Sequence, residues 1–173
     1  MVREILIYPD KRLKLVSKEI ISFDTELHTL LDDMYDTMVA KNGVGLAGIQ
    51  IGIDKRVLII NIPIGDDEDA IQPKDNTLEV INPIFLEKNG STIYQEGCLS
   101  VPTIFEDVKR AKHIKLEYQD RFGEKHIIED DEFLAIALQH EIEHLEGHLF
   151  IENLSFTKRK KFEKEWKKLG NKR

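Results

Sequence analysis

The feature that most constrains this chain is the segment His140–His144, which reads His-Glu-Ile-Glu-His and follows an apolar run over Phe133–Leu138. Side chains four residues apart share one face of an α-helix, so both imidazoles can reach a single metal ion. Glu141 then lies beside that ion, where a carboxylate can take a proton from a bound water. The apolar run indicates a buried helix, and buried imidazoles and carboxylates need partners. The pattern therefore predicts a metal site in the core, of the kind that supports hydrolysis.

Length and composition set the outer bounds. A chain of 173 residues has the usual size of one domain, so a single domain over 1–173 is expected. The net charge of −7 argues against a DNA-binding surface. No segment approaches the roughly 18 apolar residues of a membrane span, the first residues lack a signal-peptide core, and one cysteine excludes an internal disulfide. We expect a cytoplasmic protein without membrane contact.

The spacing of apolar residues predicts the main elements. In chain order these are a helix over 24–41, a buried strand over 57–62, a strand over 78–86 interrupted at Asn82-Pro83, a hairpin over 114–129, the buried histidine-bearing helix and a last helix over 156–170. The order lacks the strand–helix alternation of a parallel sheet. We expect an α+β fold, with antiparallel strands packed around the central buried helix and a C-terminal helix. Residues 63–77 are expected to form an exposed acidic loop, without an assigned function.

Two histidines leave a zinc or iron ion one protein ligand short of a catalytic site. Phe150 occupies the position at which some zinc peptidases carry a third histidine, and it cannot ligate. His148 lies beyond Gly147, which ends the helix, so its direction is open. Glu163 and Glu165 have the spacing of the glutamate ligand of other zinc peptidases, but they lie in a lysine-dense segment that favours a solvated role.

Cys98 is the remaining candidate ligand, although a lone cysteine has other uses. Many such cysteines are small buried hydrophobes, and beside a histidine a cysteine can be the nucleophile of a hydrolase. Gly97 before it lets backbone or substrate approach closely. The residues alone leave open a metal hydrolase that uses Cys98, an HExxH zinc endopeptidase that does not, a cysteine hydrolase, and a non-enzymatic metal-binding module closed by a ligand such as His148.

Taken together, motifs along most of the chain resemble those of peptide deformylases. In order they are GVGLAGIQ over 43–50, EGCLS over 96–100 and QHEIEH over 139–144, preceded by a fitting Tyr-Pro-Asp segment at 8–10. Two positions depart from the family pattern: Gly48 stands where alanine is usual, and Glu143 where aspartate is frequent. Neither departure removes a chemical group that the site needs.

The resemblance implies a metal-dependent hydrolase that removes the N-formyl group from the N-terminal methionine of newly synthesised proteins and releases formate. It implies that Cys98, His140 and His144 hold one divalent metal ion, for which Fe²⁺ is typical of the family and Zn²⁺ is the alternative. The substrates are then N-formyl-methionyl nascent peptides, and we expect a monomer.

The same resemblance assigns the remaining chemistry. Glu141 acts as general base toward the metal-bound water and then as general acid toward the leaving nitrogen. The side chain of Gln50 and the backbone N–H of Leu99 stabilise the oxyanion. The family pattern also suggests that Glu96 and Arg110 form a partly buried ion pair that fixes the cysteine loop.

An extended substrate is expected to hydrogen-bond to the backbone of residues 43–45, as an added strand does. The substrate-binding candidates share only their closeness to the motifs; they are Gly43, Val44, Gly45, Gly97, Tyr94, Phe133, Ile136 and Ala137. Ordinary core packing is the alternative for each apolar side chain among them.

Residues 158–173 hold nine Lys or Arg and only two acidic residues. An apolar stripe of Phe162, Trp166 and Leu169 predicts that this C-terminal helix packs on the body, with its charges in solvent. A further hypothesis is that the basic helix contacts ribosomal RNA and so brings the enzyme to emerging chains.

Overall fold

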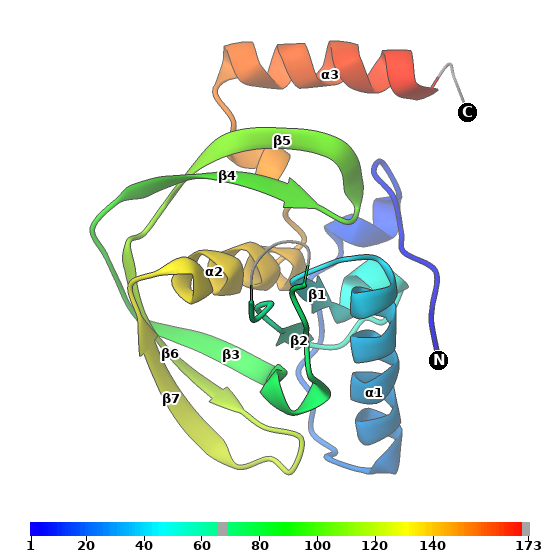
Figure 1. The fold of residues 1–173 in the computed structure, drawn as a ribbon, viewed down its shortest axis with the longest axis vertical. Helices are drawn as coiled ribbons and strands as arrows, with labels where there is room; N and C mark the ends of the chain where they lie inside the picture. The colour runs from blue at the N-terminus through cyan, green and yellow to red at the C-terminus, as the bar shows by residue number, and fades with distance from the viewer. Residues whose placement is uncertain (66–68, 171–173) are drawn as a thin grey trace.

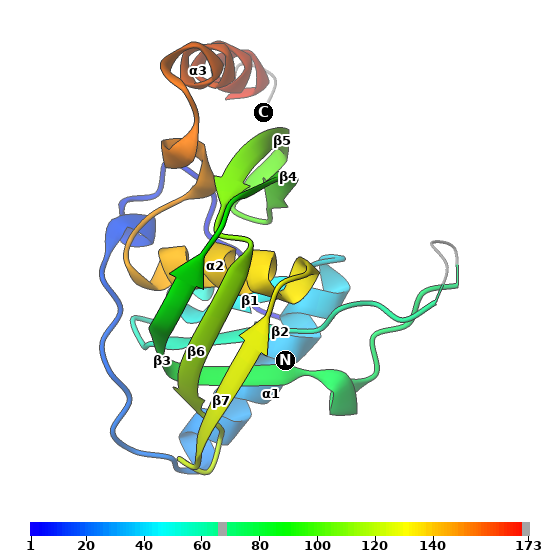
Figure 2. The same cartoon turned by 90° about the vertical axis from the view of Figure 1, so that its left-hand side faces the viewer.

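The computed structural model describes residues 1–65 and 69–170 and shows two antiparallel sheets with three α-helices. The helices are α1 (Thr25–Ala40), α2 (Phe133–Leu145) and α3 (Phe156–Gly170). The larger sheet has the order β1 (Gly45–Ala47), β2 (Val57–Ile60), β3 (Leu78–Asn89), β6 (His113–Gln119) and β7 (Lys125–Asp130), and the smaller sheet pairs β4 (Thr92–Cys98) with β5 (Val101–Arg110). Helix α2 runs between the two sheets, as Figures 1 and 2 show. The α+β prediction is confirmed.

Helix α1 forms where the sequence predicts it. The side chain of Asp24 accepts a hydrogen bond from the Leu27 N–H and so caps the first turn. The helix ends before Asn42, which has a positive φ of 55°. Its apolar face is buried against β1 and β2 through Leu27, Leu30, Leu31, Met34 and Met38.

Helix α2 is the buried centre of the molecule, since nine of its 13 residues are buried. The Asp130 carboxylate accepts from the backbone N–H groups of Glu132 and Ala135, which fixes the start of the helix. Gly147 lies just past the end with φ 78°, and a Cβ there would lie 2.5 Å from the Lys14 carbonyl oxygen. Glycine is therefore required where the sequence predicts the end of the helix.

The predicted interruption of the strand over 78–86 is wrong, because β3 continues from Leu78 to Asn89. Its pairing with β6 shifts register between Ile81 and Ile84, so Asn82-Pro83 forms a bulge rather than a break. The Asn82 side chain accepts from the Ile20 N–H at 2.9 Å and donates to the Ile20 carbonyl at 2.8 Å. The Asn82 side chain thus ties the bulge to a neighbouring segment of the chain.

Sequence analysis did not predict β1, β4 or β5. The β1 strand has only three residues inside a glycine-rich segment, and the burial of β5 lacks a strict two-residue alternation. The β4–β5 pair also shifts register between Glu96 and Cys98. Such irregular strands are stabilised by partners elsewhere in the chain, and local periodicity does not reveal them.

The predicted acidic loop is exposed over most of its described residues, while 66–68 lie outside them. Ile64 and Ile71 form an isolated antiparallel bridge within it. Lys74–Asn76 form a short 3-10 turn before β3. None of the helices in the described ranges has the length and apolar character that crossing a membrane requires.

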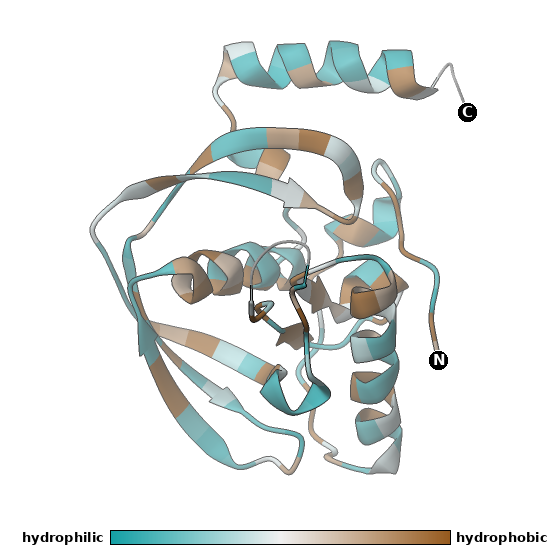
Figure 3. Cartoon of the chain, viewed as in Figure 1, coloured by the Kyte–Doolittle hydropathy of each residue, from teal (hydrophilic) through white to brown (hydrophobic). Residues whose placement is uncertain are grey.

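Helix α3 begins at residue 156 as predicted and runs to 170; the predicted basic segment continues over 171–173, which lie outside the described residues. Figure 3 shows α3 as mostly hydrophilic, in contrast to the central helix. Phe162 is its only buried residue, and Trp166 and Leu169 pack beside it on the cluster around β5. The predicted apolar stripe is confirmed as the contact with the body.

Candidate metal centre

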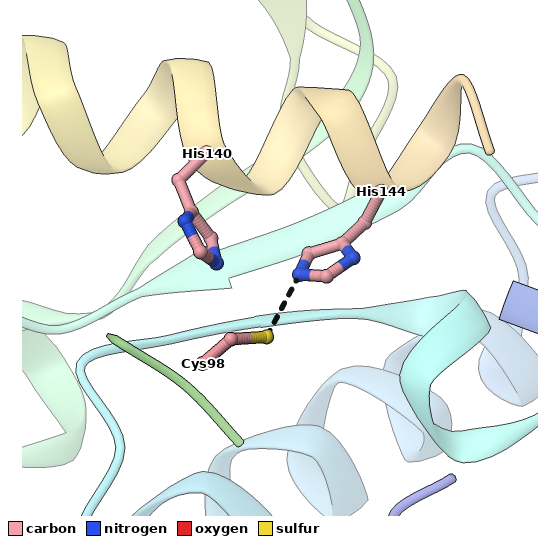
Figure 4. Close-up of side chains that lie close together, drawn as sticks. All are labelled: Cys98, His140 and His144. Carbon is pink, nitrogen blue, oxygen red and sulfur yellow. Dashed lines mark hydrogen bonds between the residues drawn. The ribbon is translucent and has the colours of Figure 1, made fainter. Parts of the chain in front are cut away.

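Cys98, His140 and His144 bring one possible ligand atom each to within 4.8 Å of one another. Cys98 is the last residue of β4, and both histidines project from α2 toward it, as Figure 4 shows. The Cys98 Sγ lies 3.3 Å from the His144 Nε2. Among the residues described, no other group of three His, Cys, Asp or Glu side chains meets in this way.

The two histidines are held differently. His140 Nδ1 lies 2.8 Å from Glu96 Oε1, so it donates to that carboxylate and leaves Nε2 facing the cluster. The Nδ1 of His144 is buried and has no hydrogen-bond partner in the described part of the chain. Burial lowers the pKa of His140, but hydrogen bonds to Cys98 and Glu96 outweigh it and hold this pKa well above its ordinary value. Burial, with the nearby positive charge, holds the pKa of His144 well below it.

This donor set fits a divalent cation. A thiol sulfur and two imidazole nitrogens converge from rigid elements, and such ligands suit Zn²⁺ or Fe²⁺. One buried carboxylate, Glu96, already orients a ligand as metal sites require. The described residues alone do not supply hydrogen-bond partners for all the polar atoms of this thiol and the two buried imidazoles.

The ion pair predicted between Glu96 and Arg110 is present and buried. Arg110 donates through Nε and Nη2 to both Glu96 oxygens, at 2.7 and 2.8 Å. Its Nη1 donates to Glu143 Oε1 at 2.5 Å, so Glu143 belongs to the same network. Burial raises the pKa of Glu96, but the hydrogen bonds from Arg110 and His140 outweigh burial and lower it. The network fixes His140 and the strand that carries Cys98.

Glu141 is buried beside the cluster, and its Oε2 has no hydrogen-bond partner among residues 1–65 and 69–170. Burial raises the pKa of its carboxyl to about 7, against the opposing effect of His140. A Cβ at Gly45 would overlap this carboxylate. Glycine at position 45 is thus required for Glu141 to lie beside β1. The arrangement leaves one carboxylate oxygen available for a proton.

Gln50 lies on the other side of Cys98 and is 1% exposed. Its Oε1 accepts from the Ala47 N–H at 2.9 Å, and its Nε2 donates to Ser100 Oγ at 3.1 Å. The same Nε2 lies 3.5 Å from the Cys98 sulfur. The amide group is therefore oriented with its N–H bonds toward the cysteine. Sequence analysis did not single out Ser100, because a serine beside a cysteine motif carries no distinctive signal.

A cavity of about 460 Å³ opens beside these groups. It is lined by all eight substrate-binding candidates and by Gln50, Cys98, Leu99, His140 and Glu141. The Tyr94 and Phe133 rings, 5.4 Å apart between centroids, form one aromatic wall. Sequence analysis missed further lining residues, namely Lys41, Asn42, Gln95, Pro102, Thr103 and Phe105. Several of these flank the cysteine on the β4–β5 pair, and predicting that hairpin would have pointed to them.

The other candidate ligands lie elsewhere. His148 is exposed and faces Glu152, with 3.1 Å between Nδ1 and Oε2. Glu163 and Glu165 form loose ion pairs along α3. Phe150 is 1% exposed, and its ring stacks on His140 at 5.9 Å between centroids. The position of a third histidine in some zinc peptidases is thus a packing position here.

Comparisons with known proteins all point to one family. The family described as "Polypeptide deformylase" matches residues 2–160. A peptide deformylase from Campylobacter jejuni is 58% identical, covering 97% of this chain and 95% of that protein. A peptide deformylase from Helicobacter pylori strain G27 is 54% identical, covering 98% of this chain and 95% of that protein. A crystal structure of a peptide deformylase from Legionella pneumophila superposes with a TM-score of 0.88 at 38% identity, covering 100% of this chain and 99% of the other.

Proposed function

The chain belongs to the peptide deformylase family, and from that premise we propose which of its residues remove the N-formyl group from the N-terminal methionine of newly synthesised proteins. The reaction is a metal-dependent hydrolysis that releases formate and a free amine. This membership decides against the endopeptidase, the cysteine hydrolase and the non-enzymatic module. The observation that carries our assignment is the convergence of Cys98, His140 and His144 beside a buried Glu141 with an unpaired oxygen.

We assign Cys98, His140 and His144 as the ligands of one divalent cation, Fe²⁺ in preference to Zn²⁺. When bound, the cation acts as a Lewis acid that polarises the formyl carbonyl and lowers the pKa of water. The Glu96–Arg110 network supports this assignment, because it holds His140 Nδ1 protonated and leaves its Nε2 lone pair for the cation.

Glu141 is the proton carrier of the reaction. It takes a proton at Oε2 from the water that adds to the formyl carbon, and it returns this proton to the amide nitrogen as the C–N bond breaks. Its buried position supports the role, since the unpaired oxygen and the raised pKa both favour a carboxylate that accepts and releases protons near neutral pH.

Two donors stabilise the oxyanion that forms on the formyl oxygen. These are the Gln50 Nε2 and the backbone N–H of Leu99. The fixed orientation of the Gln50 amide, held at both ends by Ala47 and Ser100, supports this role. A preorganised donor of this kind contributes roughly 3 kcal/mol to the transition state.

The substrate lies along β1 as an added strand. β1 is at the edge of the described sheet, so its outer side is open toward the cavity. The methionine side chain packs against the apolar lining, formed by Val44, Tyr94, Phe133, Ile136 and Ala137. Gly43, Gly45 and Gly97 lack side chains where the peptide backbone approaches.

A single experiment tests these assignments. The protein is purified without oxygen, its metal is quantified, and formate release is measured with formyl-methionyl peptides. Cys98→Ser should reduce the metal content, and alkylation of Cys98 should be blocked by bound metal. Full metal content and full turnover in Cys98→Ser would overturn the ligand assignment.

We further propose that residues 1–173 form one domain, that the enzyme works in the cytoplasm as a monomer, and that the basic face of α3 contacts ribosomal RNA. Neutralising Lys164, Lys167 and Lys168 to Gln leaves the buried Phe162 in place and should weaken salt-dependent co-sedimentation with ribosomes. Unchanged co-sedimentation of this variant would contradict the ribosome contact.

A further inference from the structure

The described residues between β2 and β3 have no role in the chemistry above. We call residues 61–65 and 69–77 the arm. Figure 2 shows the chain leaving β2, projecting from the body and returning before β3. Ile64 and Ile71 exchange two backbone hydrogen bonds of 2.9 Å, which join its two sides. The arm is thus a built structure rather than a loose connection.

Gln72 joins the arm to the wall of the cavity. Its side-chain Nε2 donates to the Gly43 carbonyl at 2.9 Å and to the Asn61 carbonyl at 2.7 Å. The backbone carbonyl of Gln72 accepts a hydrogen bond from the Tyr35 hydroxyl on α1 at 2.7 Å. Gln72 therefore holds three segments together, namely α1 at Tyr35, the chain before β1 at Gly43 and the base of the arm at Asn61.

These contacts replace a missing pair in the sheet. The β1–β2 register ends with Gly45 opposite Ile60, and the Asn61 N–H donates to the Val44 carbonyl at 2.8 Å. Beyond this point the donor to the Asn61 carbonyl is the Gln72 amide, which also donates to the Gly43 carbonyl. The side chain thus takes the place of a strand at the end of the ladder.

The backbone that Gln72 fixes is the backbone that faces the substrate. The Gly43 N–H donates to the Met38 carbonyl at 2.9 Å, so Gly43 is held from both sides. Because Val44 points its carbonyl toward β2, the backbone groups of Gly45 point to the open edge. Glycine has the largest backbone freedom of any residue, and Gly43 and Gly45 flank a bend at Val44, so this segment needs external restraint to keep one conformation.

We propose that Gln72 is a positioning residue, which holds Gly43 and the bend at Val44 so that β1, which starts at Gly45, is placed to receive the peptide backbone of the substrate. The inference rests on the proposed function, since it concerns how the formyl-methionyl peptide binds. Gln72 acts through Gly43 and touches neither the metal ligands nor Glu141. Its effect should therefore fall on binding of extended peptides and not on the hydrolytic step.

The test compares two substrates, a formyl-methionyl tripeptide and N-formylmethionine, which has no backbone beyond its methionine. In Gln72→Ala the KM for the tripeptide should rise about fivefold, as expected for the loss of one or two neutral hydrogen bonds. The values of kcat, metal content and the KM for N-formylmethionine should stay close to those of the wild type. Gln72→Glu should raise the tripeptide KM further, because it sets a carboxylate against two carbonyls.

Two further variants secure the result. Gln119→Ala is the control. Its side-chain amide also makes two hydrogen bonds, donating to the Gly123 carbonyl at 3.1 Å and accepting from Asn82 Nδ2 at 2.9 Å, and its kinetics should be unchanged because neither partner lines the cavity. Tyr35→Phe removes only the hydroxyl that holds the Gln72 carbonyl. If Gln72→Ala folds poorly, Tyr35→Phe should still raise the tripeptide KM, by a smaller factor.

An unchanged tripeptide KM in Gln72→Ala, or an equal rise for both substrates, would overturn the inference. Loss of kcat together with metal would also overturn it, since Gln72 would then support the whole site and not the peptide edge. If the wild type releases formate from neither substrate, the proposed function itself fails, which is a distinct result.

Discussion

Helices α2 and α3 are similar in length but opposite in surroundings. Nine of 13 residues are buried in α2, whereas Phe162 alone is buried among the 15 residues of α3. Helix α3 contacts the body through a few aromatic rings, with Tyr8 lying 5.6 Å from Phe162 and 5.7 Å from Trp166 between centroids. Its ion pairs are loose, at 3.8 to 3.9 Å, both within the helix and from Lys158 and Lys161 to Glu106 of β5.

In α2 the polar side chains point into the core, so each one needs a partner. His140 donates a hydrogen bond to Glu96, Glu143 accepts one from Arg110, and Glu141 retains an oxygen without a partner in the described part of the chain. The difference teaches that reactivity here follows burial: a polar group that cannot reach water is either paired or poised to react. Substitutions in α2 should therefore change chemistry, while those in α3 should leave the chemistry unchanged and affect only stability or the proposed ribosome contact.

The largest effect is expected for Glu141→Gln. Removing the proton carrier should lower kcat for formate release by about a thousandfold, as for other general bases, with metal content unchanged. The stability of the metal-free protein should not fall, since a buried carboxylate with an unpaired oxygen is replaced by a neutral amide. Steady-state kinetics, metal analysis and thermal unfolding check this, with Glu163→Gln on α3 as control. A variant with more than about a tenth of wild-type kcat would contradict the proton-carrier role.

The next effect is expected for Arg110→Met, which leaves the buried carboxylate of Glu96 and the half-buried carboxylate of Glu143 without their cation. Breaking a buried pair in this way costs about 4 kcal/mol of unfolding free energy. Denaturant unfolding measures it, and metal affinity should fall as well because Glu96 orients His140. The double variant Arg110→Met/Glu96→Gln should recover part of the loss. Equal stability of the single and double variants would argue against a coupled network.

A smaller effect, confined to stability, is expected for Phe162→Ala in α3. Truncating this buried ring should cost about 3 kcal/mol, because it removes the main contact of the helix with the body. Well below the unfolding temperature, kcat and KM should match the wild type. A large loss of kcat in a fully folded sample would show that α3 influences the chemistry, and would remove the contrast between the helices.

The smallest effect is expected for Glu163→Ala, which breaks the ion pair with Arg159. The two groups are 3.8 Å apart and about half exposed. An exposed pair of this kind contributes at most about 0.5 kcal/mol, so unfolding free energy and kinetics should hardly change. A loss as large as that of Phe162→Ala would mean that the charges of α3 contribute to its docking.

Much of the helical framework was predictable from local patterns. The stripe over 24–41, the apolar run before the histidines and the aromatic stripe near the end each became a helix, because side-chain periodicity and caps act within a few residues. The β4–β5 pair was not predictable in this way. Its bulge at Glu96–Cys98 breaks the alternation, and the pair is stabilised by contacts with the chain around Phe150 and Phe162.

The site, too, has a part that local sequence predicts and a part that depends on tertiary packing. By itself the sequence determined that His140, Glu141 and His144 lie close together, because a helix sets the distance between residues four positions apart. It did not determine the third ligand, since from the residues alone Cys98 competed with other candidates; the family resemblance favoured it. Tertiary structure brought Cys98 to His144 across 46 positions, buried Arg110 between Glu96 and Glu143, and set Gln72 against Gly43. Such contacts depend on how elements pack, and no local pattern records that packing.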